Sequence, residues 1–190
     1  SSMAQLLAIL VMPTTGKLVL DPIKTIDGNK GFYSKFSHEN ETAKAGYYKV
    51  DLEDYKIKAE LTTSERVGFH QYTFPKSSES HILLDLVYNV YHHDNKNVWT
   101  FLRVENDSIV TGYRQTKGFR AYFNFDTNED EKIKMKFALS PVSSDGAMKN
   151  LEAEIPHWDF NKTKEETQEK WNKELSKIEV ETIEESQKET

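Results

Sequence analysis

A period-two alternation of apolar and polar residues recurs along this chain, and it constrains the fold more than any other feature. Between residues 47 and 52 the apolar side chains recur at every second position, with a lysine and an aspartate between them. The same pattern returns in residues 57–61 and again in residues 132–139. Such alternation is typical of β-strands with one buried face. Roughly ten short strands of this kind, separated by polar turns, predict an all-β fold, an antiparallel β-sandwich.

The individual strands are placed by their apolar runs and by the turn residues between them. Single strands are expected at residues 18–20, 47–52, 57–61, 67–74 and 81–91, and hairpins at 98–104 with 108–113 and at 121–125 with 132–139. The 81–91 strand carries apolar residues on both faces at Ile82–Leu84. This predicts that it is buried between two layers.

Helical spacing replaces the alternation near the C-terminus. A short helix is expected over residues 144–151. A second helix is expected from Asn161, because Thr163 and Glu166 have the spacing of a capping box. The chain is therefore divided into a β-sandwich domain at residues 1–160, a linker helix at 161–180 and a polar, acidic, disordered tail at 181–190.

The second helix carries an apolar stripe. Trp171, Leu175 and Ile178 follow one another at i, i+4 and i+7 and so share one helix face. Most helical stability comes from packing of such a face, so a lone amphipathic helix has to bury it. Together with Trp158, these residues are predicted to form a packing interface, either on the sandwich or on a further domain.

Composition excludes several classes of function. The chain has 190 residues, a net charge of -6 and no cysteine. Disulfides, thiolate catalysis and cysteine-bound zinc are therefore excluded, and the acidic balance argues against nucleic acid as a partner. The longest apolar run, Leu6–Met12, is too short for a membrane span, which needs about 20 residues. It also lacks the flanks of a signal peptide.

Several long strings resemble the N-terminal domain of the bacterial calcium-dependent α-mannosidases of glycoside hydrolase family 92. They are ILVMPTTG at 9–16, FSHENETAKAGYY at 36–48, RVGFHQYTFP at 66–75, VTGYRQTKGF at 110–119 and FALSPVSSDGAMKNLEAEIPHWDF at 137–160. The resemblance implies a supersandwich-like fold and a linker helix that leads into a catalytic (α/α) barrel. It also implies a periplasmic or extracellular parent that acts on mannose-rich glycans.

The chain departs from the family pattern at two places. Family members carry a longer segment before the ILVMPTTG string, and they carry an insertion where Phe119 here runs directly into Arg120. The resemblance places the catalytic acids and the calcium site on the barrel, beyond these residues. No catalytic residue, metal ligand or cofactor can therefore be assigned to this chain, and calcium is expected only in the parent enzyme.

A polar cluster provides the candidate glycan or domain-interface residues. They are Ser37, His38, Glu39, Glu41 and, at a separate position, Arg114. The first four could contact sugar hydroxyls or an adjoining domain, or they could form a solvated turn, which is the more frequent role of polar loop residues.

Other polar groups fit structural roles better than chemical ones. The adjacent residues His92 and His93 point to opposite faces of a strand and are poorly placed to share a metal ion. The acids in residues 51–54 are too close in sequence to face each other across a cleft as glycosidase carboxyls do. The loop at 126–131 lacks EF-hand spacing, and His70 and His81 are expected to be packed or hydrogen-bonded.

The function predicted from the sequence is a non-catalytic domain of an exo-α-1,2-mannosidase. It supports the catalytic barrel, which is its expected partner, and helps to form the glycan-binding cleft. The isolated chain is expected to be inactive. The alternatives are a free-standing carbohydrate-binding sandwich, a stand-alone glycosidase that uses the acids above, and a trimmed scaffold domain without ligand.

Overall fold

The computed structural model describes residues 9–21, 31–86, 100–106, 108–114 and 120–177. Within these ranges the elements follow in the order β1 (Leu10–Thr15), η1 (His38–Asn40, a 3-10 turn), β2 (Thr42–Lys44), β3 (Tyr47–Leu52), β4 (Ile57–Thr63), β5 (Val67–Phe74), β6 (Ser77–Asp85), β7 (Thr100–Asn106), β8 (Ile109–Arg114), β9 (Arg120–Thr127), β10 (Glu131–Ala138), α1 (Ser144–Glu154) and α2 (Phe160–Leu175).

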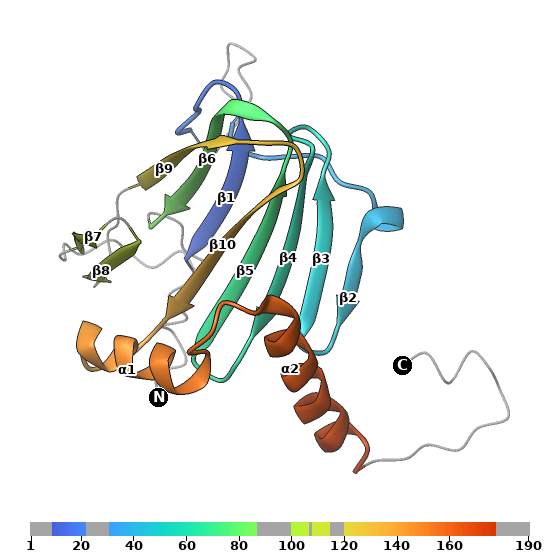
Figure 1. Cartoon of the computed structure of the whole chain (residues 1–190), viewed down its shortest axis with the longest axis vertical. Helices are drawn as coiled ribbons and strands as arrows, with labels where there is room; N and C mark the ends of the chain where they lie inside the picture. Colours follow the sequence, from blue (N-terminus) through green and yellow to red (C-terminus); the bar gives the residue numbers. More distant parts are fainter. Residues whose placement is uncertain (1–8, 22–30, 87–99, 107, 115–119, 178–190) are drawn as a thin grey trace, which may run out of the picture.

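The strands form two main sheets and a separate hairpin. One sheet has the order β1-β6-β9, and the other has the order β10-β5-β4-β3-β2 (Figure 1). Every neighbouring pair is antiparallel. Among the strands of the described ranges, β7 and β8 pair with each other and with no third strand. The predicted antiparallel β-sandwich followed by a C-terminal helix is confirmed.

The main core lies between the two sheets. Val50, Ile57 and Tyr72 from the five-stranded sheet pack in one buried cluster with Ile82 from β6. Ile82 is 0% exposed and Tyr72 only 2% exposed. Burial of these apolar side chains is the main contribution to the stability of such a sandwich. Alternation along the strands places these residues on one face, as the sequence predicted.

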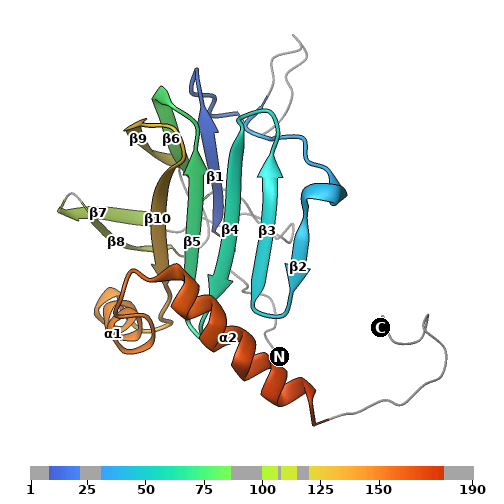
Figure 2. The ribbon, with the colours of Figure 1, turned by 45° about the vertical axis from the view of Figure 1, so that its right-hand side comes forward.

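A second core covers the opposite face of β5. Val67 and Phe69 point away from the sandwich interior and pack with Ile155, at the end of α1, and with Phe160, at the start of α2. α2 runs across the lower ends of β5, β4 and β3 (Figure 2). At this end the five-stranded sheet is therefore buried on both faces, with Val67 and Phe69 of β5 in the second core and Tyr72 and Phe74 in the main core.

The prediction that Ile82–Leu84 lie in a buried central strand is confirmed. Residues 82–84 are at most 7% exposed, and β6 is the middle strand of its sheet. The predicted hairpin around residues 106 and 107 is also confirmed as β7 and β8.

The predicted strand at residues 18–20 is wrong. The first strand is instead Leu10–Thr15, in which Pro13 pairs with Ile82 at the edge of the three-stranded sheet. A proline cannot donate a ladder hydrogen bond, so it is tolerated at such an edge.

The hairpin predicted for residues 121–125 and 132–139 is also wrong. β9 pairs with β6 in one sheet, and β10 pairs with β5 in the other. The acidic turn at 128–130 therefore carries the chain from one sheet to the other. Alternation shows which residues of a strand are buried, but it does not show which neighbour the strand takes.

The capping box predicted at Thr163 and Glu166 is wrong because α2 begins earlier. Asp159 is the N-cap, and its carboxylate accepts a hydrogen bond from the backbone N–H of Lys162 at 3.1 Å. Thr163 lies inside the helix and donates from its hydroxyl to the carbonyl of Asp159 at 3.2 Å.

Neither helix in the described ranges has the length and hydropathy of a membrane-crossing segment.

Candidate functional site

The predicted polar cluster forms a short, exposed turn beside the edge strand β2. Ser37 begins the 3-10 turn, and its hydroxyl accepts a hydrogen bond from the backbone N–H of Glu39 at 3.2 Å. The backbone N–H of Asn40 donates to the carbonyl of Ser37 at 3.0 Å. The turn presents His38 and Glu39 to solvent and directs Glu41 back toward β3.

Glu41 is the centre of this cluster. Its Oε1 accepts a hydrogen bond from the Tyr48 hydroxyl at 2.6 Å, and its Oε2 lies 2.6 Å from Nδ1 of His38. The hydrogen bond from Tyr48, followed by that from His38, lowers the pKa of the Glu41 carboxyl below its ordinary value. The same contact with Glu41, together with burial, raises the pKa of Tyr48 to about 12. The carboxylate is therefore held ionised between two donors.

This arrangement favours binding over proton transfer. A carboxylate with a lowered pKa is a poor general acid, since such acids in glycosidases have raised pKa values. Phe36 is 49% exposed, and its ring meets the His38 ring edge-on at 5.4 Å between centroids. An exposed aromatic ring beside a fixed carboxylate and an imidazole can contact both the face of a sugar ring and its hydroxyls.

The structure does not bring Arg114 to this cluster. Arg114 ends β8, and the β7–β8 hairpin lies on the other side of the sandwich from the η1 turn (Figures 1 and 2). The predicted residues Ser37, His38, Glu39 and Glu41 therefore form one site, and Arg114 belongs to another surface.

The predicted helical interface residues are partly exposed. Trp171 is 48% and Leu175 is 55% exposed on α2, and Trp158 is 54% exposed just before the helix. Ile178 lies outside the described residues. Trp171 lies one turn after the buried Thr167 and beside Gly46 of the β2–β3 turn, so it extends the packed face of α2 while about half of its surface stays exposed.

The helix face that packs on the sandwich was not predicted. It consists of Phe160, Thr163 and Thr167, which are the buried residues of α2. The hydroxyl of Thr167 donates to the carbonyl of Thr63 at the end of β4 over 2.5 Å. The sequence signal for this face is the spacing of Thr163 and Thr167, three and seven residues after Phe160. Because threonine is polar, a hydropathy pattern does not show the face.

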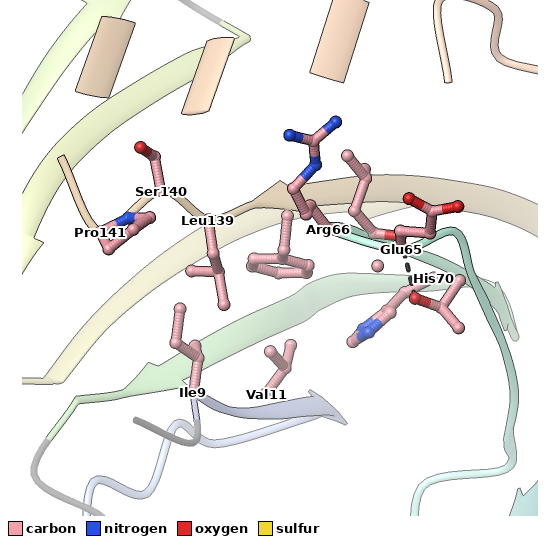
Figure 3. Close-up of a pocket in the computed structure, with 12 residues that line it drawn as sticks. Ile9, Val11, Glu65, Arg66, His70, Leu139, Ser140 and Pro141 are labelled. Atoms are coloured by element: carbon pink, nitrogen blue, oxygen red, sulfur yellow. Dashed lines mark hydrogen bonds between the residues drawn. The ribbon is translucent and has the colours of Figure 1, made fainter. Parts of the chain in front are cut away.

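A pocket at the open end of the sandwich was also not predicted. It has a volume of about 470 Å³ and lies between Ile9 and Val11 on one wall and Leu139 on the other (Figure 3). His70 lies at its inner end, with its Nδ1 2.8 Å from the Tyr72 hydroxyl. The prediction that His70 is packed and hydrogen-bonded is confirmed. Burial lowers the pKa of His70 to about 4, so the imidazole is neutral near pH 7.

His81 is likewise a structural histidine. It is 7% exposed, and its Nδ1 lies 2.6 Å from Oδ1 of Asn124 while its Nε2 lies 2.8 Å from the carbonyl of Gly16. Both ring nitrogens are therefore occupied, as the sequence predicted. His92 and His93 lie outside the described residues.

Three of the other acids hold turns. Asp54 accepts a hydrogen bond from the backbone N–H of Lys35 at 2.8 Å, and Glu129 accepts one from that of Lys76 at 3.0 Å. Glu131 accepts from the backbone N–H of Asn128 at 2.7 Å. Across the ranges that the structure covers, no three His, Asp or Glu side chains gather closely enough to hold a metal ion.

Comparison with protein families gives two successive matches. The sequence model of the glycosyl hydrolase family 92 N-terminal domain matches residues 1–121. The model of the glycosyl hydrolase family 92 catalytic domain matches residues 146–190. The second match covers most of α1, all of α2 and the residues after them. No curated protein matches the sequence.

Solved structures give the same result. A family 92 α-mannosidase from Bacteroides thetaiotaomicron has a TM-score of 0.76 and 27% identity over 92% of this chain and 29% of that chain. The same enzyme in complex with mannoimidazole has a TM-score of 0.75 and 27% identity over 91% of this chain and 28% of its own. An inverting family 92 mannosidase from Bacteroides thetaiotaomicron VPI-5482 shares the fold, with a TM-score of 0.65 and 20% identity over 90% of this chain and 27% of its own. The chain spans less than a third of the length of these enzymes.

Proposed function

The chain belongs to glycoside hydrolase family 92, and from this premise we propose that it is the non-catalytic N-terminal domain of an exo-α-1,2-mannosidase. It supports the catalytic domain and contributes to the glycan-binding cleft. The single observation that carries the proposal is the order of the two family matches, with residues 1–121 similar to the N-terminal domain and 146–190 similar to part of the catalytic domain.

The packing of α2 supports this role. One face of the helix is fixed on the sandwich through Phe160 and Thr167. Trp171 and Leu175 remain about half exposed. Aromatic and aliphatic side chains that remain exposed next to a packed face are suited to a further protein layer. That layer is the remainder of the catalytic domain, whose family model already includes α2.

The described residues also support a non-catalytic role. Glycoside hydrolysis uses one carboxyl with a raised pKa and a second that faces it across a cleft. Asp54 and Glu129 hold backbone N–H groups in turns, and Glu41 has a lowered pKa. Calcium, if the parent enzyme needs it, would be bound by the catalytic domain, and secretion would be a property of the whole enzyme.

A second candidate function is a carbohydrate-binding sandwich. The observation in its favour is the exposed Phe36 ring beside His38 and the doubly bonded Glu41. In this role the turn would bind a mannose-rich glycan without hydrolysing it, with Ser37 and Glu39 as further polar contacts.

The test is hydrolysis of α-1,2-mannobiose by the purified chain, with calcium and then with a chelator, alongside calorimetric titration of the same sugar. We expect no turnover in either condition, and millimolar or weaker binding. Turnover would overturn the proposal, because a carboxyl pair would then lie in these residues. Tight binding that is lost in Phe36→Ala but not in Tyr33→Ala, a second exposed aromatic, would instead establish the carbohydrate-binding function. A stable monomer that neither binds nor hydrolyses is the result expected of a supporting domain.

A further inference from the structure

Two lysines on the outer face of β10 hold the connection between α1 and α2. Nζ of Lys136 donates to the carbonyl of Ile155 at 2.9 Å, and Nζ of Lys134 donates to the carbonyl of Trp158 at 2.8 Å. Lys136 also lies over the Trp158 ring, 4.1 Å from its centroid. A cation at this distance from an indole face is attracted by the ring quadrupole.

The connection itself is short and is anchored at both ends. Ile155 is the C-cap of α1, and Phe160 is the first residue of α2. Each is 1% exposed and packs on Phe69 and its neighbours in the second core. Four residues separate these two anchors, so their backbone carbonyls and the Trp158 ring determine the angle at which α2 leaves α1.

The position of Lys136 at the end of α1 is electrostatically favourable. The last carbonyls of a helix lack partners within the helix and carry the negative end of its dipole. An ammonium that reaches the C-cap carbonyl satisfies one of these groups. An apolar side chain at position 136 could cover Phe69, but it could not donate to the Ile155 carbonyl.

Further contacts fix the two helices on either side of the connection. Before it, Glu154 accepts hydrogen bonds from the hydroxyl of Ser64 at 2.5 Å and from the backbone N–H of Arg66 at 2.9 Å. After it, Thr167 bonds to the end of β4. The lysines therefore act in the middle of a series of contacts that follows the chain from α1 to α2.

We propose that Lys134 and Lys136 are positioning residues that clamp the α1–α2 connection and set the direction in which α2 leaves the sandwich. In a longer chain this clamp would orient the catalytic domain on the sandwich, and that consequence rests on the proposed function above. The clamp itself concerns only contacts within the described residues.

The alternative is that the lysines contribute only to the overall stability of the fold. The two possibilities differ in where protection from hydrogen exchange is lost. A positioning clamp controls a local opening in which α2 separates from the sheet, whereas a general contribution weakens all elements together.

The experiment is hydrogen–deuterium exchange by mass spectrometry on the whole chain, comparing Lys136→Met with wild type. We expect amides of α2 to exchange on the order of tenfold faster, while those of β4 and β5 keep their protection. Lys132→Met is the matched control, since Lys132 is on the same face of the same strand but is exposed. Equal exchange in α2 for Lys136→Met and Lys132→Met would overturn the proposal, as would an equal acceleration in α2 and β5.

Three further variants keep the test decisive if Lys136→Met does not fold. Lys136→Arg retains the cation and should retain most of the protection of α2. Lys134→Met removes the contact with the Trp158 carbonyl but leaves Lys136 in place. Trp158→Leu removes the ring but leaves both carbonyl contacts, and we expect it to accelerate exchange in α2 less than Lys134→Met does. An acceleration in Trp158→Leu as large as in Lys134→Met would contradict the role of the lysines. No sugar is used, so this result is independent of the mannoside experiment.

Discussion

Gly46, in the turn between β2 and β3, lies directly under Thr167 of α2. A Cβ atom added to Gly46 would stand 2.6 Å from Cγ2 of Thr167, which is closer than two carbon atoms can approach. Gly46 also has a φ of +76°, in the left-handed region that disfavours other residues. Two independent requirements therefore select glycine at this position, the local turn and the approach of a helix more than 100 residues later.

Substitution of Gly46 by alanine should destabilise the protein by roughly 2–4 kcal/mol, measured by urea unfolding. Roughly 1–2 kcal/mol would come from the left-handed backbone, and the remainder from displacement of α2. Thr167→Ser should recover part of the loss in the double variant. Serine lacks Cγ2 but retains the hydroxyl that donates to the Thr63 carbonyl.

Gly16 offers the control for this substitution. It has a φ of +80°, but an added Cβ would meet no atom within 4 Å. Gly16→Ala should therefore show only the backbone cost, roughly 1–2 kcal/mol. If both alanine variants lose the same free energy, the contact between Gly46 and α2 has no energetic importance.

Glu154 joins the end of α1 to the β4–β5 turn, and its charge should matter there. Its Oε2 accepts from Ser64 and from the Arg66 backbone, and its Oε1 lies 2.5 Å from Nε of Arg66. Glu154→Gln leaves a single accepting oxygen for these donors. We expect a loss of about 1–2 kcal/mol in the free energy of unfolding, against no measurable loss in Glu152→Gln, which changes an exposed residue of the same helix.

The Glu154 contribution should also depend on pH. Burial raises the pKa of Glu154, but the hydrogen bonds from Ser64 and Arg66 outweigh it and hold the pKa below its ordinary value of 4.5. The stabilisation is thus present above about pH 4.5 and is lost as the pH falls through the lower pKa of the folded state. Wild type and Glu154→Gln should converge in stability toward acid. A constant difference down to pH 2 would contradict this.

His70 should make the fold sensitive to milder acid. Its pKa is lowered by burial from 6.5 to about 4, so the unfolded chain binds a proton before the folded chain does. The contribution of neutral His70 to the free energy of unfolding is fully present above about pH 6.5, and it is lost as the pH falls toward 4. Between pH 7.5 and 5 the loss should be about 2 kcal/mol, since one pKa unit corresponds to about 1.4 kcal/mol.

The measurement is urea unfolding of wild type and His70→Gln at several pH values. His70→Gln should lower stability at pH 7.5, because it alters a buried contact with Tyr72, but its stability should fall less on acidification. An unchanged acid dependence in His70→Gln would exclude His70 as its cause.

The differences between the predicted and observed folds have identifiable physical causes. Alternation correctly located β3 and β4, because their residues follow one buried face. It could not assign β9 and β10 to different sheets, since the sequence of a single strand does not show which strand it pairs with. The contact face of α2 was missed because Thr163 and Thr167 are buried through hydrogen bonds and close packing, which a hydropathy pattern does not register.

The candidate site was predicted in part for similar reasons. The density of polar residues at 37–41 indicated a cluster, but the sequence could not show that Glu41 turns back to meet Tyr48 on β3. The Tyr48 contact depends on the pairing of β2 with β3, in which Ala43 lies opposite Tyr48. Arg114, predicted as a candidate at a separate position in the sequence, ends β8 and does not join the cluster.

The Tyr48 hydroxyl should control the charge state of the candidate site. Because its hydrogen bond is the largest cause of the lowered pKa of Glu41, Tyr48→Phe should raise that pKa toward 4.5 and weaken the fixation of the carboxylate. The pKa can be followed by NMR titration of the Glu41 side-chain carboxyl. Tyr47→Phe is the matched control, since the Tyr47 hydroxyl donates to Glu60 at 2.8 Å instead. It should leave the Glu41 titration unchanged.

If mannoside binding is detected, it should weaken in Tyr48→Phe and persist in Tyr47→Phe, whereas equal binding in both would place the sugar on another surface.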